Sequence, residues 1–107
     1  MYFKDHLFVT GGASGGQDSS DTYIYDRKSD QWRNAGAMPT SRYGLSCGLH
    51  TDPTAGNAIV VAAGGYNIAE GGGTLSTVEI FTCNVESWST SVSLPTPLRD
   101  ATSVQVM

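Results

Sequence analysis

The two histidines of the chain are the first candidates for chemistry, because imidazole binds metals and transfers protons near neutral pH. His6 and His50 lie far apart in the sequence, with Asp5 and Asp52 near them. A metal site needs three or four converging ligands. Cys47 is close to His50, but their spacing would place the two side chains on opposite faces of a strand. The sequence therefore predicts no metal site and no cofactor.

The other reactive groups are also isolated. Cys47 and Cys83 lie within or at the edge of strand-like segments, where buried and unreactive thiols are expected. The glycine-rich residues 11–16 follow a strand, but they lack the helix and the Lys-Ser/Thr pair of a phosphate-binding loop. Aspartate pairs such as Asp18 and Asp21 are typical of solvated turns. These patterns do not predict an enzyme.

Two arginines occupy a more informative position. Arg42 and Arg99 each follow a proline within four residues and precede a strand-like segment. Arginine forms bidentate hydrogen bonds with carboxylates and phosphates and is enriched where proteins bind each other. Its recurrence in both units favours a structural role, in an ion pair within the protein. Two interpretations therefore stay open for these residues, a structural role and partner binding together with Ser41 and Tyr43.

The composition narrows the class of protein. The 107 residues are 39% hydrophobic and 15% charged, with a net charge of −4. The six Lys and Arg residues are scattered, so no basic patch is available for nucleic acid or an anionic membrane. The longest apolar run, residues 58–63, is far shorter than the ~20 residues of a transmembrane helix. No signal peptide is visible, and we expect a cytoplasmic location.

The elements that position these residues form an internal repeat. Residues 7–12 match residues 60–65 at an offset of 53, and both segments end in a Gly-Gly pair. Changes in the offset mark insertions, which belong in loops. Further matches are found at an offset of 56 for Tyr25 with Phe81, Trp32 with Trp88, Met38 with Leu94 and Pro39 with Pro95, and at 57 for Arg42 with Arg99.

Each unit has the pattern of short β-strands. Apolar runs precede the Gly-Gly pairs, and runs rich in β-formers precede four-residue segments of hairpin-turn length. No segment has convincing helical periodicity, so the predicted class is all-β. The expected strands are residues 7–10, 21–26, 44–50, 58–63, 77–82 and 101–106, together with the segments around Trp32 and Trp88.

The order of these features resembles the kelch repeat. The matching residues are Gly11, Gly12, Tyr25, Trp32 and Pro39 in the first unit and Gly64, Gly65, Phe81, Trp88 and Pro95 in the second. The second unit departs from the pattern at Thr82, which replaces an aspartate, and at Leu94, which replaces Met38. The resemblance implies four-stranded antiparallel blades of a β-propeller, with the two tryptophans filling the space between neighbouring blades.

The strand order predicts about two blades of an incomplete ring. We expect an N-terminal extension over residues 1–6, because no room for a strand is left before Leu7. The first kelch repeat is expected over residues 7–52 and the second over residues 53–106, each ending in the inner strand of a following blade. Further kelch repeats in a longer chain, or self-association, would complete the ring.

The resemblance also implies a function. Kelch propellers bind a partner protein or peptide through loops over a rigid scaffold, and some are substrate-recognition parts of cullin-type ubiquitin ligase adaptors. Arg42 and Arg99 would then lie at the rim of the central channel. The alternatives are an actin-associated kelch scaffold and, less in keeping with the sequence, part of a kelch-propeller oxidase, whose copper ligands have no matching positions here.

Overall fold

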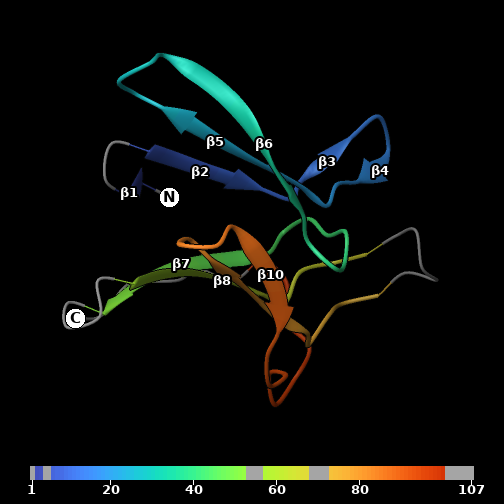
Figure 1. The fold of residues 1–107 in the computed structure, drawn as a ribbon. Coiled ribbons are helices and arrows are strands. Elements are labelled where there is room, and N and C mark those ends of the chain that lie inside the picture. The colour runs from blue at the N-terminus through green and yellow to red at the C-terminus, as the bar shows by residue number, and fades with distance from the viewer. Residues whose placement is uncertain (1, 4–5, 53–56, 68–72, 101–107) are drawn as a thin grey trace.

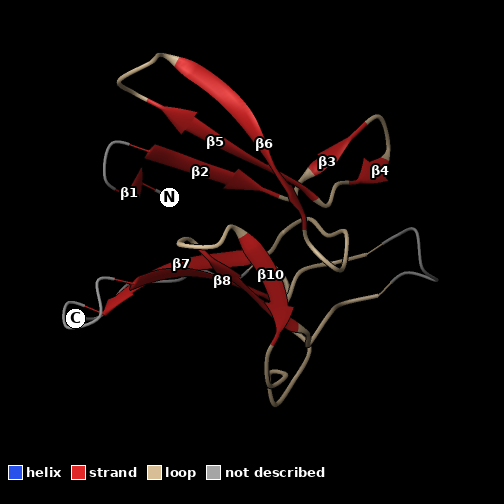
Figure 2. Cartoon of the chain, viewed as in Figure 1, coloured by secondary structure: helices blue, strands red, loops and turns tan. Residues whose placement is uncertain are grey.

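The computed structural model describes residues 2–3, 6–52, 57–67 and 73–100. Every regular element within these ranges is a β-strand, and the strands form two four-stranded antiparallel sheets and one two-stranded hairpin. The two sheets lie face to face, the first above the second in Figure 1 and Figure 2. The prediction of an all-β chain made of four-stranded sheets is confirmed.

The first sheet has the strand order β1-β2-β5-β6. Its members are β1 (Tyr2–Phe3), β2 (His6–Thr10), β5 (Asp21–Asp26) and β6 (Gln31–Ala37). The short β1 lies within residues 1–6, which were expected to form an N-terminal extension. It belongs to the sheet because Tyr2 pairs with Leu7 and Phe3 with His6. Two residues are enough to form this edge strand, because its hydrogen-bonding groups pair with the exposed edge of β2. Part of the predicted extension therefore belongs to the sheet.

The second sheet contains four complete strands in chain order. These are β7 (Ser46–Asp52), β8 (Asn57–Ala63), β9 (Val78–Thr82) and β10 (Ser87–Thr90). They agree with the predicted strands to within a few residues at each end. A small hairpin that was not predicted, β3 (Ala13–Ser14) with β4 (Gln17–Asp18), lies in the loop between β2 and β5. The strand predicted at residues 101–106 lies outside the described residues.

The Gly-Gly pairs mark the sites where a loop passes close to the end of a strand. Gly11 and Gly64 both have positive φ, at 73° and 69°. A Cβ atom on Gly11 would come within 2.9 Å of the carbonyl oxygen of Arg42, and one on Gly64 within 2.4 Å of that of Leu98. Both the backbone conformation and the available space therefore require glycine here.

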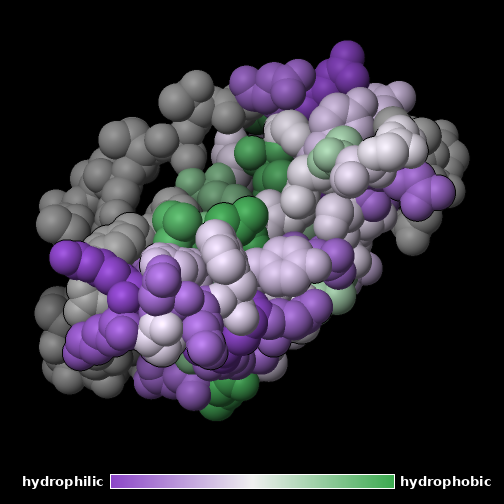
Figure 3. Space-filling view, turned by 90° about the horizontal axis from the view of Figure 1, so that it is seen from above, coloured by the Kyte–Doolittle hydropathy of each residue, from purple (hydrophilic) through white to green (hydrophobic). Residues whose placement is uncertain are grey.

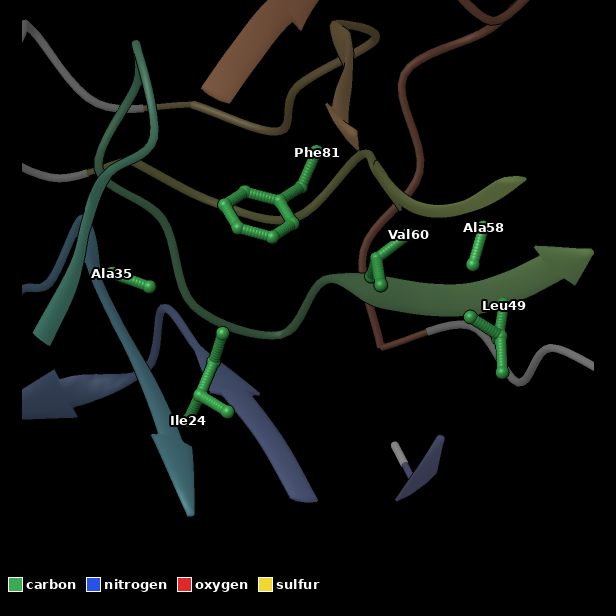
Figure 4. Packing of buried hydrophobic residues seen from close by; sticks show 6 residues of the cluster. All are labelled: Ile24, Ala35, Leu49, Ala58, Val60 and Phe81. Atoms are coloured by element: carbon green, nitrogen blue, oxygen red, sulfur yellow. The ribbon is translucent and has the colours of Figure 1, made fainter. Parts of the chain in front are cut away.

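The hydrophobic core lies between the two sheets. Phe81 of the second sheet is 1% exposed, and its ring lies 5.0 Å from that of Phe8 and 5.3 Å from that of Trp88. Trp88 Nε1 donates a hydrogen bond to Thr22 Oγ1 of the first sheet at 3.2 Å. Figure 4 shows side chains from both sheets meeting in this cluster, which comprises Ile24, Ala35, Leu49, Ala58, Val60 and Phe81.

One face of the first sheet has no sheet against it among the described residues. We call it the upstream face and define it as Leu7, Val9, Tyr23, Tyr25 and Trp32. Figure 3 looks down on it and shows hydrophobic surface near its centre with hydrophilic residues at its edges. The predicted position of Trp88 between the sheets is confirmed. Trp32 instead packs on Tyr25 and is 55% exposed, because none of the described strands covers this face.

Candidate interaction surface at the long loops

The long loops lie at one end of the two sheets, and the tight β5–β6 and β9–β10 turns lie at the other (Figure 1). The loop after β6 contains Arg42, the first residue predicted to bind a partner. The structure places Arg42 in the interior, with an exposed fraction of 0%. Of the two interpretations left open by the sequence, the structural one fits this position, and direct contact between Arg42 and a partner does not.

The burial of Arg42 is explained by the groups around its guanidinium. Nη1 donates hydrogen bonds to the carbonyl oxygens of Gly64 and Thr77, at 2.8 and 3.0 Å. Nη2 lies 2.7 Å from Oε1 of Glu79, which is itself 2% exposed. Glu79 also accepts hydrogen bonds from the backbone N–H and the hydroxyl of Thr40. A buried charge is tolerated when it is paired and hydrogen-bonded in this way.

The pairing around Arg42 is nevertheless incomplete. Nε has no hydrogen-bond acceptor among the residues that the structure describes, and the contact of Nη2 with Glu79 has the distance of an ion pair without the geometry of a hydrogen bond. A buried ion pair of this kind gives little or no net stability relative to apolar side chains of similar volume. Removal of one partner alone is a different matter, because it leaves the other charge uncompensated.

Ser41 and Tyr43, the neighbours of Arg42, are only partly buried. The side-chain amide of Asn67 donates to the carbonyl oxygen of Ser41 at 2.6 Å and to its hydroxyl at 3.2 Å. Tyr43 pairs with Tyr66 through two backbone hydrogen bonds, and their rings are 5.5 Å apart. The structure thus joins the loop after β6 to the loop after β8.

Arg99 lies on the surface beside these two loops. Its side chain is exposed, and its guanidinium carbon lies 4.8 Å from the centre of the Tyr66 ring, a cation–π contact. Tyr43, Tyr66 and Arg99 form what we call the loop cluster. Sequence reasoning missed Tyr66, although its position directly after a Gly-Gly pair could have indicated a loop near those of the two arginines.

Arg99 does not occupy the position that corresponds to Arg42. The N–H of Gly12 donates to the carbonyl of Arg42, and the N–H of Gly65 donates to the carbonyl of Leu98. By these equivalent hydrogen bonds, Leu98 is the residue that corresponds to Arg42, at an offset of 56. The predicted pairing of Arg42 with Arg99 at an offset of 57 is therefore wrong, because the loop after β10 is not one residue longer up to this point.

A cavity of about 240 Å³ lies between the sheets near the tight turns. Apolar side chains from both sheets line it, including Phe8, Val60 and Phe81. Arg33 forms an ion pair with Glu86 at its polar edge. Within the described ranges, no group of three or more His, Cys, Asp or Glu side chains has the arrangement of a metal site.

The thiols of Cys47 and Cys83 are partly buried. Burial raises the pKa of the Cys47 thiol and that of the Cys83 thiol. Since the thiolate is the reactive form, we expect iodoacetamide at pH 7.5 to alkylate both residues at least about tenfold more slowly in the folded chain than in urea. Mass spectrometry of quenched samples measures the rates. Equal rates in the folded and unfolded chain would contradict this expectation.

Comparison with known proteins identifies the repeated unit. The family described as the kelch motif matches residues 2–39, which include the whole of the first sheet. Residues 2–39 thus carry a kelch motif. The chain is also similar to the kelch repeat-containing protein kel-10 of Caenorhabditis elegans, with 29% identity over 86 residues. The aligned region covers 80% of this chain and 14% of kel-10.

The two four-stranded sheets are therefore blades of the kelch type, as predicted from the sequence. The kelch match begins at residue 2, in agreement with the inclusion of β1 in the first blade. The seam between the blades contains Phe81 and Trp88, two of the residues that carried the resemblance. The described part of the chain has no helix with the length and apolar character needed to cross a membrane.

Proposed function

We propose that this kelch segment is a protein-interaction module that binds a partner protein or peptide through its long loops. The observation that carries the proposal is the loop cluster, in which the exposed Arg99 lies against Tyr66 and Tyr66 against Tyr43. Arginine and tyrosine are among the residue types enriched at the energetic centres of protein interfaces. The role we propose is binding rather than catalysis.

The backbone around the loop cluster supports this role. Tyr66 pairs with Tyr43 on one side and with Thr74 on the other, so the central ring of the cluster is held by two backbone pairings. Asn67, which is buried, fixes the next residue through its contacts with Ser41. A rigid scaffold that presents aromatic and arginine side chains loses little conformational entropy when a partner binds.

The test is a quantitative pull-down with the chain as bait. We expect Arg99→Glu to reduce the capture of specific partners about tenfold or more, because it reverses the charge and removes the cation–π contact. Lys28→Glu is the matched control, since it makes the same charge change at the β5–β6 turn, at the other end of the blades. Equal capture by the wild type, Arg99→Glu and Lys28→Glu would overturn the proposal.

Within this class, we propose substrate recognition for a cullin-type ubiquitin ligase as the specific role. The support for it is the kelch-repeat family alone, in which such adaptors occur. Immunoprecipitation of the protein from its own cells with an antibody against this chain, followed by detection of a cullin, tests the role. Absence of a cullin while loop-dependent partners are still captured would leave the binding function standing and exclude the adaptor role.

A further inference from the structure

We propose that the cavity between the two sheets is a binding site for a small neutral phenol. The side chains that line the cavity come from both sheets and from the β9–β10 turn. This site is independent of the loop cluster, which lies at the other end of the sheets in Figure 1. The proposal therefore does not rest on the proposed function.

The walls of the cavity are apolar and buried. Four of the residues that line it are at most 9% exposed, namely Ile24 of the first sheet and Leu49, Val60 and Phe81 of the second. Phe8 also lines the cavity, and its ring is tilted by 52° against that of Phe81. Cavities with apolar walls of this kind stay dry and take up apolar molecules.

The size of the cavity suits a molecule of one or two aromatic rings. Its volume is about 240 Å³, whereas an engineered apolar cavity of about 150 Å³ binds benzene. Protein interiors are otherwise close-packed, so a void of this size leaves the surrounding side chains without contacts that an occupant would supply. The rings of Phe8 and Phe81 can contact the edge or the face of a flat ligand.

The polar side of the cavity gives the ligand a way in and an orientation. Arg33 and Glu86 form an ion pair there, with 48% and 37% of their side chains exposed, so solvent reaches this side. Asn84, from the same turn as Glu86, also lines the cavity. An amphipathic molecule would therefore place its polar group beside this turn and its ring against the apolar walls.

The charges around the cavity favour a neutral ligand. Nη1 of Arg33 donates a hydrogen bond to Glu86, and Nε2 of His6 lies 3.8 Å from Oδ2 of Asp26. Both basic side chains that line the cavity thus have a carboxylate beside them. A carboxylate ligand would be repelled by Glu86, and an ammonium ligand would compete with Arg33 for it. Either one would also lose its hydration on entering.

The ion pair identifies a hydroxyl as the polar group of the ligand. A carboxylate can accept several hydrogen bonds and a guanidinium can donate five. Glu86 can therefore accept a further hydrogen bond besides that from Arg33, and Arg33 can donate a further one. A hydroxyl both donates and accepts, so it can join the two without separating them. A phenol carries this group on an aromatic ring and is neutral at pH 7, because its pKa is about 10.

Titration of the chain with 2-naphthol, followed by NMR spectra of the backbone amides, tests the proposal. We expect a Kd of about 0.1 mM, with the shifts concentrated in β2, β8, β9 and the β9–β10 turn. 2-Naphthoate has the same rings with a negative charge and should bind at least about tenfold more weakly. Absence of saturable binding, shifts confined to other strands, or equal binding of 2-naphthoate would overturn the proposal.

Three variants test the position of the ligand. Cys83 lines the cavity, and Cys83→Phe should weaken the binding of 2-naphthol at least about tenfold because the new ring fills the space. Val85→Phe is the matched control, since it adds the same ring in the same turn at a residue that is 69% exposed. Glu86→Gln should reduce the preference for 2-naphthol over 2-naphthoate to about threefold or less. Equal binding by the wild type and Cys83→Phe, or an unchanged preference in Glu86→Gln, would contradict the proposed site.

A measurement on the wild type does not depend on the folding of any variant. Saturating 2-naphthol should slow the alkylation of Cys83 by iodoacetamide at least about threefold more than that of Cys47, because Cys83 lines the cavity and Cys47 does not. Both thiols are partly buried, so Cys47 reports any general stabilisation of the folded chain. Equal effects on the two cysteines would place the ligand elsewhere and overturn the proposal.

Discussion

Replacement of Arg42 by leucine should lower the free energy of unfolding by about 3–5 kcal/mol, because it leaves the buried carboxylate of Glu79 without a cation. The carbonyl oxygens of Gly64 and Thr77 lose their donor in the same change. Small domains are stable by only about 5–15 kcal/mol, so most of the chain would unfold on mild heating. Urea denaturation followed by tryptophan fluorescence measures the loss.

Arg33→Leu is the matched control, since it removes the more exposed ion pair with Glu86. Such surface pairs contribute about 1 kcal/mol or less. A second comparison uses the double variant Arg42→Leu with Glu79→Tyr, which removes both charges of the buried ion pair. The new side chains are those that the other unit has at the equivalent positions, since Leu98 lies 56 residues after Arg42 and Tyr23 lies 56 residues before Glu79. This double variant should recover most of the stability. If Arg42→Leu were no more destabilising than Arg33→Leu, the buried position of Arg42 would be contradicted.

Phe81→Ala is expected to destabilise the chain by about 3–5 kcal/mol, the range typical of a buried phenylalanine. The ring fills the centre of the seam, where it contacts Phe8 and Trp88. Its removal leaves a cavity between the two blades that neither sheet can close without giving up contacts. Urea denaturation gives the loss of stability. A red shift of the tryptophan emission would report the entry of water beside Trp88.

Tyr25→Ala provides the control, because Tyr25 occupies the position of Phe81 in the first blade. It lies on the upstream face and packs mainly on Trp32. At concentrations where the chain is monomeric, the expected loss is about 1 kcal/mol or less. Similar losses for Phe81→Ala and Tyr25→Ala would show that the two faces are equally covered in solution, contrary to the structure of the single chain.

Much of the fold could be predicted because the two units share both their strands and the glycines at the turns that follow those strands. Gly11 and Gly64 have positive φ in equivalent turns, and few residues other than glycine permit that conformation. Trp88 was expected between the blades and lies there. Its counterpart Trp32 shows the limit of this reasoning, since a repeated pattern defines a face for each blade but does not indicate whether a neighbour covers it.

The candidate site was harder to predict because it is formed by loops. In a strand, a shift of one residue moves a side chain to the other face, so the pattern itself fixes the register. A loop has no such constraint, and the sequence alone could not distinguish Leu98 from Arg99 as the counterpart of Arg42. The role of Glu79 was hidden for a related reason. A carboxylate within a strand gives no sign of the loop that will supply its partner.

The separation of the two sheets has a consequence for the way the chain opens. In the described residues, the ladder hydrogen bonds join strands within one sheet, whereas the seam consists chiefly of side-chain contacts. The blades can therefore part as units while their ladders stay intact. Such an opening would expose the indole of Trp88 to solvent and leave the backbone amides of β8 and β9 protected from hydrogen exchange.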